Sequence, residues 1–359
     1  MFQFDEIASL PPFSLGERDK NSLFERAMAD MTLFHFERCE DYRKIVRGLG
    51  FDTKSLRGVS DFPFLPVRLF KSHELLSVDR REVVKTMTSS GTTGQSVSKI
   101  FLDRETSSRQ TKALARITSD FIGGHRLPML VVDSSELLKD RKMFSARGAG
   151  ILGFSMLGRD VTYALDGEMR LNLDAIEAFL DRHKGGNVLL FGFTFMIWEY
   201  FYKALAESGR RLPIDGGVLI HGGGWKKLQA SAVDPASFAE ALRSVCGVSR
   251  VHNYYGMVEQ TGSIFMECEE GRLHCSIFSD VIVRRHMDFL PCPTGDEGLI
   301  QTISLLPWSY PGHSILTEDI GRVTGVDDCP CGRLGRTFAV KGRIARAEAR
   351  GCGDTYEKR

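Results

Sequence analysis

The sequence has no apolar run long enough to cross a bilayer and no excess of charge of either sign. Its net charge is +1 over 359 residues, so the charge gives no reason to expect a nucleic-acid or anionic-membrane partner. Residues 1–6 lack the basic segment that begins a secretory signal peptide. We therefore expect a cytoplasmic protein with no membrane span and no nucleic-acid partner.

Cysteine is also sparse. Eight cysteines in a chain of this length do not resemble a secreted disulfide scaffold, so we expect reduced thiols. Hydrophobic residues make up 42% and charged residues 26%, which is ordinary for a globular protein. The length suffices for one large core or two smaller domains.

Apolar and β-branched runs alternate with helical patterns between residues 83 and 252. The patterns predict strands at 83–88, 129–132, 188–191, 218–220 and 251–252, and helices at 16–48, 106–122, 173–182, 195–207 and 235–245. Strands that alternate with helices of this length predict an α/β fold with a parallel sheet covered by helices. From about residue 263 the segments are strand-like, which predicts a smaller β-rich subdomain over residues 263–340.

One stretch after the first predicted strand is small, hydroxylated and rich in glycine. It consists of Ser89, Ser90, Gly91, Thr92, Thr93 and Gly94, with Lys99 five residues beyond. Backbone amides and hydroxyls in such a loop can surround phosphate oxygens. The Walker A pattern does not fit, because it needs a lysine directly after its last glycine. A flexible surface loop is the alternative interpretation.

This loop resembles the phosphate loop of the adenylate-forming enzymes, which activate carboxylic acids with ATP. Within that superfamily the chain is most similar to the LuxE-type acyl-protein synthetases, and phenylacetate–CoA ligases are nearer relatives than ordinary acyl-CoA synthetases. Several motifs recur in the expected order from residue 63 to the C-terminus. The resemblance implies two α/β halves and a small β-barrel-like subdomain over residues 1–340. It also implies ATP and Mg²⁺ as cofactors, with Thr93 acting in catalysis.

Two further motifs resemble nucleotide-binding segments of that superfamily. Gly222, Gly223 and Gly224 follow a predicted strand, and the resemblance places them at the adenine, although a tight turn is the plainer interpretation. The segment that follows the last predicted strand is similar to the family's Tyr-Gly-x-Thr-Glu. It implies adenine and phosphate contacts for Asn253, Tyr254, Tyr255 and Gly256 and a Mg²⁺ ligand in Glu259, since a hard cation prefers carboxylate oxygen. Val258 stands where threonine is usual.

The segment Thr317-Glu318-Asp319 resembles the family's Thr-Gly-Asp motif, with Glu318 in place of glycine. The resemblance implies that Asp319 accepts hydrogen bonds from both ribose hydroxyls, which one carboxylate can do. Arg343 lies where the family has an arginine at the start of its hinge. We expect Arg343 to contact ribose and phosphate.

Aromatic residues follow another predicted strand: Phe191, Phe193, Phe195 and Trp198. Such clusters are usually core. The resemblance places the acyl or aryl pocket near this segment, so we favour a hydrophobic pocket for the acid substrate.

Four other residues resemble a Cys-x5-His and Cys-x-Cys arrangement of the phenylacetate–CoA ligase branch. They are Cys268, His274, Cys329 and Cys331. Three thiolates and one imidazole would suit a closed tetrahedral Zn²⁺ site. The Cys-x-Cys spacing is tighter than usual, and small buried core residues are the alternative.

Cys352 lies between two glycines near the end of the sequence. LuxE-type enzymes acylate a cysteine near their C-terminus, and Cys352 lies at the corresponding place. We expect residues 341–359 to form a truncated hinge and acyl-acceptor tail with no C-terminal lid domain. The resemblance then implies transfer of the acyl group from Cys352 to a partner acyl reductase. A lidless acyl–CoA or aryl–CoA ligase and a non-catalytic nucleotide-binding subunit are the alternatives. Both homo- and hetero-oligomers stay open.

The segment 148–153 matches the dinucleotide-binding pattern G-x-G-x-x-G. That pattern needs a strand directly before it, whereas charged residues precede it here. We expect a glycine-rich loop rather than a dinucleotide site.

Overall fold

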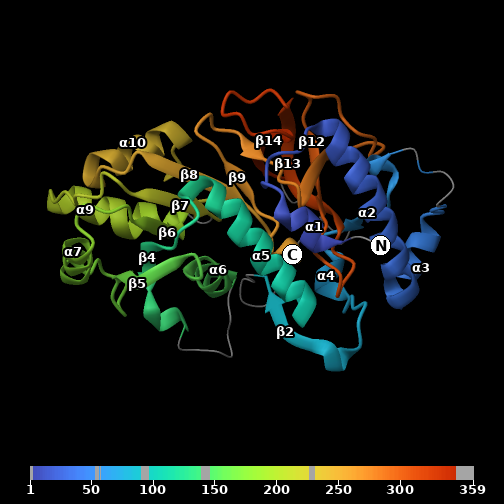
Figure 1. Ribbon diagram of the computed structural model, residues 1–359, viewed down its shortest axis with the longest axis horizontal. Helices are drawn as coiled ribbons and strands as arrows, with labels where there is room; N and C mark the ends of the chain where they lie inside the picture. Colours follow the sequence, from blue (N-terminus) through green and yellow to red (C-terminus); the bar gives the residue numbers. More distant parts are fainter. Residues whose placement is uncertain are drawn as a thin grey trace, which may run out of the picture.

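The computed structural model describes residues 3–52, 56, 58–89, 97–138, 146–225 and 231–344. Its first elements are the helices α1 (Phe4–Ser9), α2 (Glu17–Arg38) and α3 (Glu40–Gly48). The single helix predicted over residues 16–48 is two helices, because Cys39 takes an extended conformation between them. Figure 1 shows α2 and α3 at one end of the molecule and α7 and α9 at the other.

A large mixed sheet runs through the molecule. Among the described residues it has twelve strands, in the order β11-β12-β13-β14-β10-β9-β8-β7-β6-β4-β5, with β1 beside β13. The strands β4 to β8 are mutually parallel. They span Leu127–Ser134, Gly158–Leu165, Leu189–Phe193, Val218–Gly222 and Arg250–Tyr255. The predicted α/β class with a helix-covered parallel sheet is confirmed.

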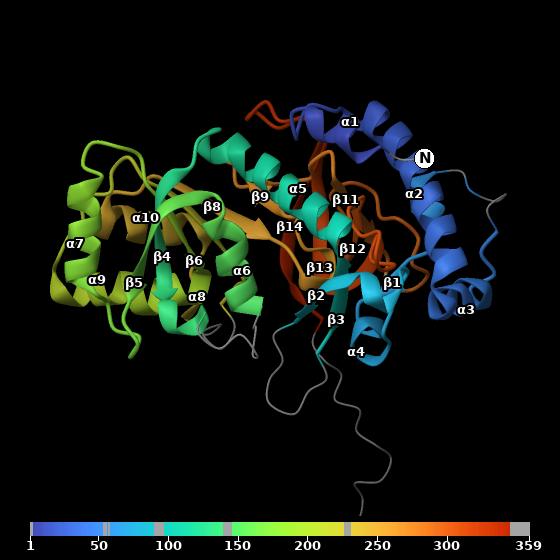
Figure 2. The same cartoon turned by 60° about the horizontal axis from the view of Figure 1, so that its bottom comes forward.

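Helices cover both faces of this parallel half. They are α5 (Arg104–Ile122), α6 (Ala146–Ser155), α7 (Leu173–Arg182), α8 (Thr194–Met196), a π-helical turn η5 (Ile197–Tyr202), α9 (Lys203–Ser208) and α10 (Pro235–Cys246). Each strand sends alternate side chains to opposite faces, so β6 contributes Phe191 to one apolar cluster and Leu190 to another. In both views α5 lies over the junction between the two halves of the sheet (Figures 1 and 2).

The remaining strands are mostly antiparallel and continue the same sheet. They are β9 (Phe265–Glu267), β10 (Leu273–His274), β11 (Ser279–Arg284), β12 (Gly298–Ser304), β13 (Ser314–Val326) and β14 (Arg336–Arg343). The antiparallel pair β8–β9 joins them to the parallel half. We propose that they form the β-rich subdomain expected over residues 263–340.

A short hairpin lies apart from this sheet and consists of β2 (Val83–Thr88) and β3 (Lys99–Asp103). It flanks the predicted phosphate loop. The elements before the hairpin are η2 (Val59–Asp61), β1 (Leu65–Pro66), α4 (Leu69–Ser72) and η3 (Arg80–Glu82), of which η2 and η3 are short 3₁₀ turns. Two more 3₁₀ turns occur later in the chain, η4 (Ser135–Leu138) and η7 (Val258–Gln260).

The expectation of a glycine-rich loop at residues 148–153 was wrong. These residues lie inside α6, where Gly150 packs against Phe193: a β-carbon at position 150 would lie 3.0 Å from the Cζ atom of that ring. Gly150 therefore allows close packing of this helix onto the end of β6.

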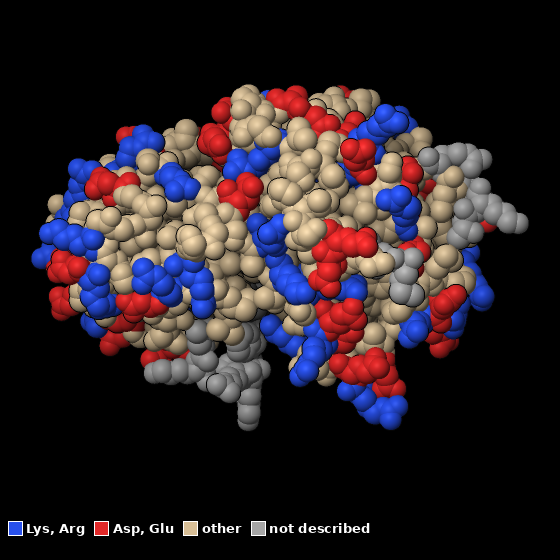
Figure 3. All heavy atoms as spheres, in the orientation of Figure 1, with Lys and Arg blue, Asp and Glu red and all other residues tan. Residues whose placement is uncertain are grey.

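Charged side chains of both signs are interspersed over the face shown in Figure 3, in keeping with the net charge of +1. Within the described ranges, no helix combines the length and apolarity that a bilayer crossing requires.

Candidate active site

Three of the predicted motifs meet where parallel strands end. Phe193 of β6 pairs with Gly222 of β7, and Gly222 pairs with Tyr254 of β8, so one row of the sheet contains a residue from each motif. The carboxyl ends of parallel strands are the usual place for ligands in α/β sheets. The sheet register therefore brings together segments that are about 30 residues apart in sequence.

The glycine residues of this row are needed for packing. A β-carbon at Gly222 would lie 2.6 Å from Cε1 of Tyr254, and one at Gly223 would lie 2.5 Å from Cδ1 of Phe193. Gly223 and Gly224 have φ values of +81° and +64°, which side chains disfavour. Apart from its two chain neighbours, no described residue has an atom within 4 Å of the position that a β-carbon of Gly224 would take. The turn can therefore lie flat beside a planar group.

A buried pair fixes the ends of β6 and β7 to each other. The hydroxyl of Thr194 donates to the carbonyl oxygen of Gly222 at 3.1 Å and lies 2.9 Å from Nδ1 of His221. Burial lowers the pKa of His221 to about 3, so this imidazole is neutral at physiological pH. The contact between His221 and Thr194 therefore supports the ends of both strands.

Asp319, Tyr255 and Arg343 form a second group. The Tyr255 hydroxyl donates to Oδ2 of Asp319 at 2.6 Å, and Nε of Arg343 donates to Oδ1 at 3.1 Å. Asp319 and Arg343 are paired residues of β13 and β14, whereas Tyr255 is the last residue of β8. Burial and the Asp319 charge raise the pKa of Tyr255 well above its usual value, so the phenol stays a donor. The structure thus brings together three residues predicted for nucleotide binding.

Glu259 lies in η7, and only 5% of it is exposed. Burial raises the pKa of its carboxyl group, while the nearby Ser98 hydroxyl and the charges of Lys71 and Arg343 oppose that rise. The Tyr310 hydroxyl donates to the backbone carbonyl of Glu259 at 2.9 Å and so fixes its position. A buried carboxylate of this kind fits a hard divalent cation, which would favour its ionised form.

The predicted phosphate loop is described only at its two ends. Ser89 and Ser98 close its base, because the Ser98 amide donates to the Ser89 hydroxyl at 2.9 Å and the Ser89 amide donates to the Ser98 carbonyl at 3.2 Å. Lys99 is exposed, with its Nζ 3.9 Å from Oε1 of Glu74. The candidates Ser90, Gly91, Thr92, Thr93, Gly94 and Cys352 lie outside the described residues. Asn253 and Gly256 flank the two tyrosines of the β8 motif.

The predicted acyl-pocket aromatics are divided between the two faces of the sheet. Phe191, Phe193 and Phe195 belong to the cluster that includes Tyr254 and Phe154. Trp198 packs in the opposite cluster, with its ring centroid 5.3 Å from that of Trp225. Trp198 lies in the π-helical turn η5 that follows β6, whereas Phe191 and Phe193 lie in the strand itself.

The two cysteine segments also meet. One ligand atom each of Cys268, His274, Cys329 and Cys331 lies within 4.8 Å of the others. The Sγ atoms of Cys268 and Cys329 are 3.8 Å apart, and the Sγ atom of Cys331 lies 3.4 Å from Nε2 of His274. Nδ1 of His274 is buried without a hydrogen-bond partner among the described residues. The donor set and its size fit a tetrahedral soft-metal site.

Lys71 in α4 escaped prediction from the sequence, although the field of its charge reaches Glu259. The only signal would have been a lysine shortly before the phosphate-loop hairpin.

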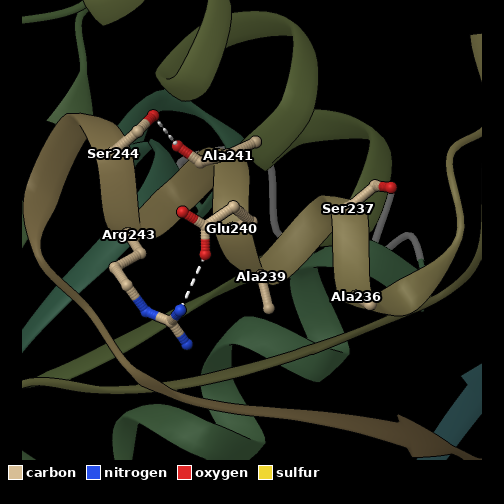
Figure 4. A pocket seen from close by; sticks show the side chains of 7 residues that line it. All are labelled: Ala236, Ser237, Ala239, Glu240, Ala241, Arg243 and Ser244. Carbon is tan, nitrogen blue, oxygen red and sulfur yellow. Dashed lines mark hydrogen bonds and ion pairs between the residues drawn. The ribbon is translucent and has the colours of Figure 1, made fainter.

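A shallow hollow elsewhere is lined by seven residues of α10, where Arg243 pairs with Glu240 (Figure 4). None of the seven is a predicted site residue, and the hollow lies on the outside of one helix.

Comparisons with known proteins show the family that the sequence resembles. A family model described as "Acyl-protein synthetase, LuxE" matches residues 3–359. The long-chain-fatty-acid–luciferin-component ligase of Vibrio harveyi is 23% identical over 349 residues, covering 93% of this chain and 87% of that protein. The phenylacetate–coenzyme A ligase of Thermus thermophilus is 23% identical over 364 residues, with 92% and 72% covered.

Among solved structures, an open conformation of 2-hydroxyisobutyryl-CoA ligase, in complex with its acyl-adenylate and CoA, superimposes with a TM-score of 0.69. The two proteins are 15% identical, and the match covers 93% of this chain and 76% of the other. At this identity the likeness establishes the fold, which is that of the adenylate-forming ligases.

Proposed function

Because the chain belongs to the LuxE family of acyl-protein synthetases, we propose that it activates a long-chain fatty acid with ATP and transfers the acyl group to a protein cysteine. The enzyme class follows from the family, and the fatty acid and the acceptor are the proposal. The observation that supports it most is the meeting of Tyr255, Asp319 and Arg343 beside the ends of the parallel strands.

In the first half-reaction a carboxylate oxygen of the acid attacks the α-phosphorus of ATP. The bond between that phosphorus and the β-phosphate bridge oxygen breaks, and pyrophosphate leaves. Asp319 would accept hydrogen bonds from the ribose hydroxyls of ATP, and the flat turn at Gly224 would lie beside the adenine. Phe193 and Tyr254 would line the wall nearest the reacting carboxyl group.

Mg²⁺ would supply electrostatic stabilisation of the phosphates, and Glu259 is the residue that would hold it. The Ser89–Gly94 segment, with Thr93, would donate hydrogen bonds to the same phosphates. A lost donor at such a site typically costs about 2.7–4 kcal/mol of transition-state stabilisation.

In the second half-reaction the thiolate of Cys352 attacks the acyl carbon. The bond from that carbon to the AMP oxygen breaks, AMP leaves, and a thioester forms. A thiolate suits this step because it is a strong nucleophile even when a small fraction is ionised. We propose an acyl reductase as the protein that receives the acyl group next.

The Cys268, His274, Cys329 and Cys331 cluster is proposed as a structural Zn²⁺ site. Burial raises the pKa of the Cys268 thiol to about 12, so a thiolate at this position needs a nearby cation. The four residues would hold the connection between β13 and β14 against β9 and β10. Such a site has no open position for substrate and would contribute to folding only.

The function is tested by two measurements on the same preparations. Acid-dependent ATP–pyrophosphate exchange reports the first half-reaction. Protein labelling by ATP with radiolabelled fatty acid, followed by hydroxylamine, reports a thioester. We expect Cys352→Ser to retain exchange and to lose the label, because a serine hydroxyl is almost wholly un-ionised. The control is Cys292→Ser, which changes a partly exposed cysteine of the described chain and should keep both.

The wild type could instead catalyse exchange, show no protein label and form acyl-CoA when CoA is added. That result would identify the chain as a CoA ligase and contradict the proposed transfer to a protein cysteine. The phenylacetate–CoA ligase relative is the observation behind that second candidate. Absence of exchange with every acid in a panel of chain lengths would contradict both.

A further inference from the structure

The helix α4 packs against the hairpin of β2 and β3, which flanks the predicted phosphate loop. Phe70 is 1% exposed and belongs to the apolar cluster that contains Met87 of β2 and Ile100 and Leu102 of β3. The loop joins these two strands, so the same cluster fixes α4 and both ends of the loop. Lys71 follows Phe70 directly, and its backbone therefore has a defined position relative to β2 and β3.

The same helix is tied to the strand that carries Asp319. Leu65 pairs with Ile315 in β13, and the Val67 amide donates to the Leu316 carbonyl at 2.9 Å. Arg68 forms an ion pair with Glu318, next to Asp319. The backbone of Lys71 is in turn held by a 3.0 Å hydrogen bond to the Arg68 carbonyl. Segment 65–71 is thus a fixed edge of the candidate nucleotide site.

Tyr310 links α4 to Glu259. Its ring meets that of Phe70 edge-on, with centroids 6.2 Å apart, and its hydroxyl donates to the Glu259 carbonyl. Because Lys71 directly follows Phe70, these two contacts place the backbone of α4 at Lys71 close to the segment that carries Glu259. Lys71 is therefore a cation on the Glu259 side of the site.

The Lys71 side chain is exposed, and within the described part of the chain it makes no hydrogen bond or ion pair. The neighbouring cations differ in this respect: Arg68 is paired with Glu318, and Lys99 lies near Glu74. An ammonium group has three donors and is a strong phosphate ligand when a rigid element presents it. Of these three cations, only Lys71 has no such partner among the described residues.

We infer that Lys71 binds the β- and γ-phosphates of ATP, on the side of the site where Glu259 would hold Mg²⁺. The inference depends on the proposed ATP-dependent function and adds a residue to it. The ammonium group would neutralise charge on the pyrophosphate as it leaves. Because AMP lacks both of these phosphates, Lys71 should distinguish ATP from AMP.

The test measures the Kd of Mg·ATP and of AMP by calorimetry for the wild type and for Lys71→Ala and Lys71→Arg. Removal of one charge-assisted phosphate contact should raise the Kd of Mg·ATP about tenfold and leave the Kd of AMP unchanged. Lys71→Arg should restore most of the affinity, because it keeps the charge. In the exchange assay, Lys71→Ala should raise KM for pyrophosphate together with KM for ATP.

Lys184→Ala is the matched control, since Lys184 is an exposed lysine in the turn after α7 at the far end of the molecule. It should change neither Kd. Equal loss of ATP and AMP affinity in Lys71→Ala would indicate a structural role and overturn the inference, as would unchanged affinity for both. Failure of wild-type protein to bind ATP or catalyse exchange would instead contradict the proposed function.

Discussion

Replacement of Asp319 by asparagine is the sharpest test of the candidate ribose site. Asparagine keeps the shape of the side chain but removes its charge and replaces one acceptor oxygen with a donor amide. Tyr255 and Arg343 each donate to one carboxylate oxygen, at 2.6 and 3.1 Å, so asparagine cannot accept from both. Nucleotide ribose would lose an acceptor at the same position.

The size of the effect follows from burial. Asp319 is 8% exposed, and a hydrogen bond to a charged group contributes about 1.5–3 kcal/mol, so loss of the Tyr255 bond should lower the unfolding free energy by that order. The Arg343 side chain is 78% exposed, and its ion pair should add only about 0.2–1 kcal/mol. Loss of one charged ribose contact would weaken ATP binding at least about tenfold.

The assay compares the Kd of ATP with that of 2′,3′-dideoxy-ATP. The wild type should prefer ATP, and Asp319→Asn should bind both about equally. Asp288→Asn is the control, because Asp288 also pairs with an arginine, Arg285 at 2.7 Å, but on an exposed hairpin. A variant that retained the preference for ATP, or a wild type without any preference, would refute the assignment of ribose binding to Asp319.

Three other predictions concern metals and pH. Glu259→Gln should raise the Mg²⁺ concentration that gives half-maximal ATP–pyrophosphate exchange about tenfold or more, because an amide is a poorer ligand for a hard cation. An unchanged Mg²⁺ titration would mean that another residue holds the Mg²⁺ ion. Purified protein should contain about one zinc per chain by elemental analysis. The Cys268→Ser variant should lose this zinc, and the control variant Cys246→Ser should keep it. Wild-type protein without zinc would mean that the four residues are packed core. Burial lowers the pKa of His313 to about 3 and that of His35 well below 6.5, so the folded protein binds fewer protons than the unfolded chain. Stability should therefore be full above about pH 6.5 and fall as the pH drops towards 3, and urea midpoints that stay flat over this range would contradict the prediction.

The sequence by itself determined the parallel half of the fold and the identity of the family. The strands β4, β6, β7 and β8 and the helices α7 and α10 follow from local periodicity, because the apolar pattern of each lies within one segment, whereas α6 and β5 were not predicted. The motif residues are short contiguous runs, so their resemblance to adenylate-forming enzymes needs no knowledge of distant contacts. For the same reason Glu259 and Asp319 could be proposed individually.

The tertiary structure decided which of these residues meet. Tyr255 reaches Asp319 across 64 residues of sequence because β8, β9, β10, β14 and β13 are neighbours in one sheet. Cys268 and Cys329 meet for the same reason. Such contacts depend on strand order and register, which local propensity does not encode.

Local patterns were also insufficient where packing overrode them. Position 150 lies in a helix and is a glycine that Phe193 closely approaches, and Trp198, in the π-helical turn after β6, packs in the cluster on the opposite face of the sheet. Lys71 carries no motif at all. Its place beside Glu259 depends on Phe70, Tyr310 and the pairing of β1 with β13, which are contacts between segments about 240–250 residues apart that only the folded chain brings together.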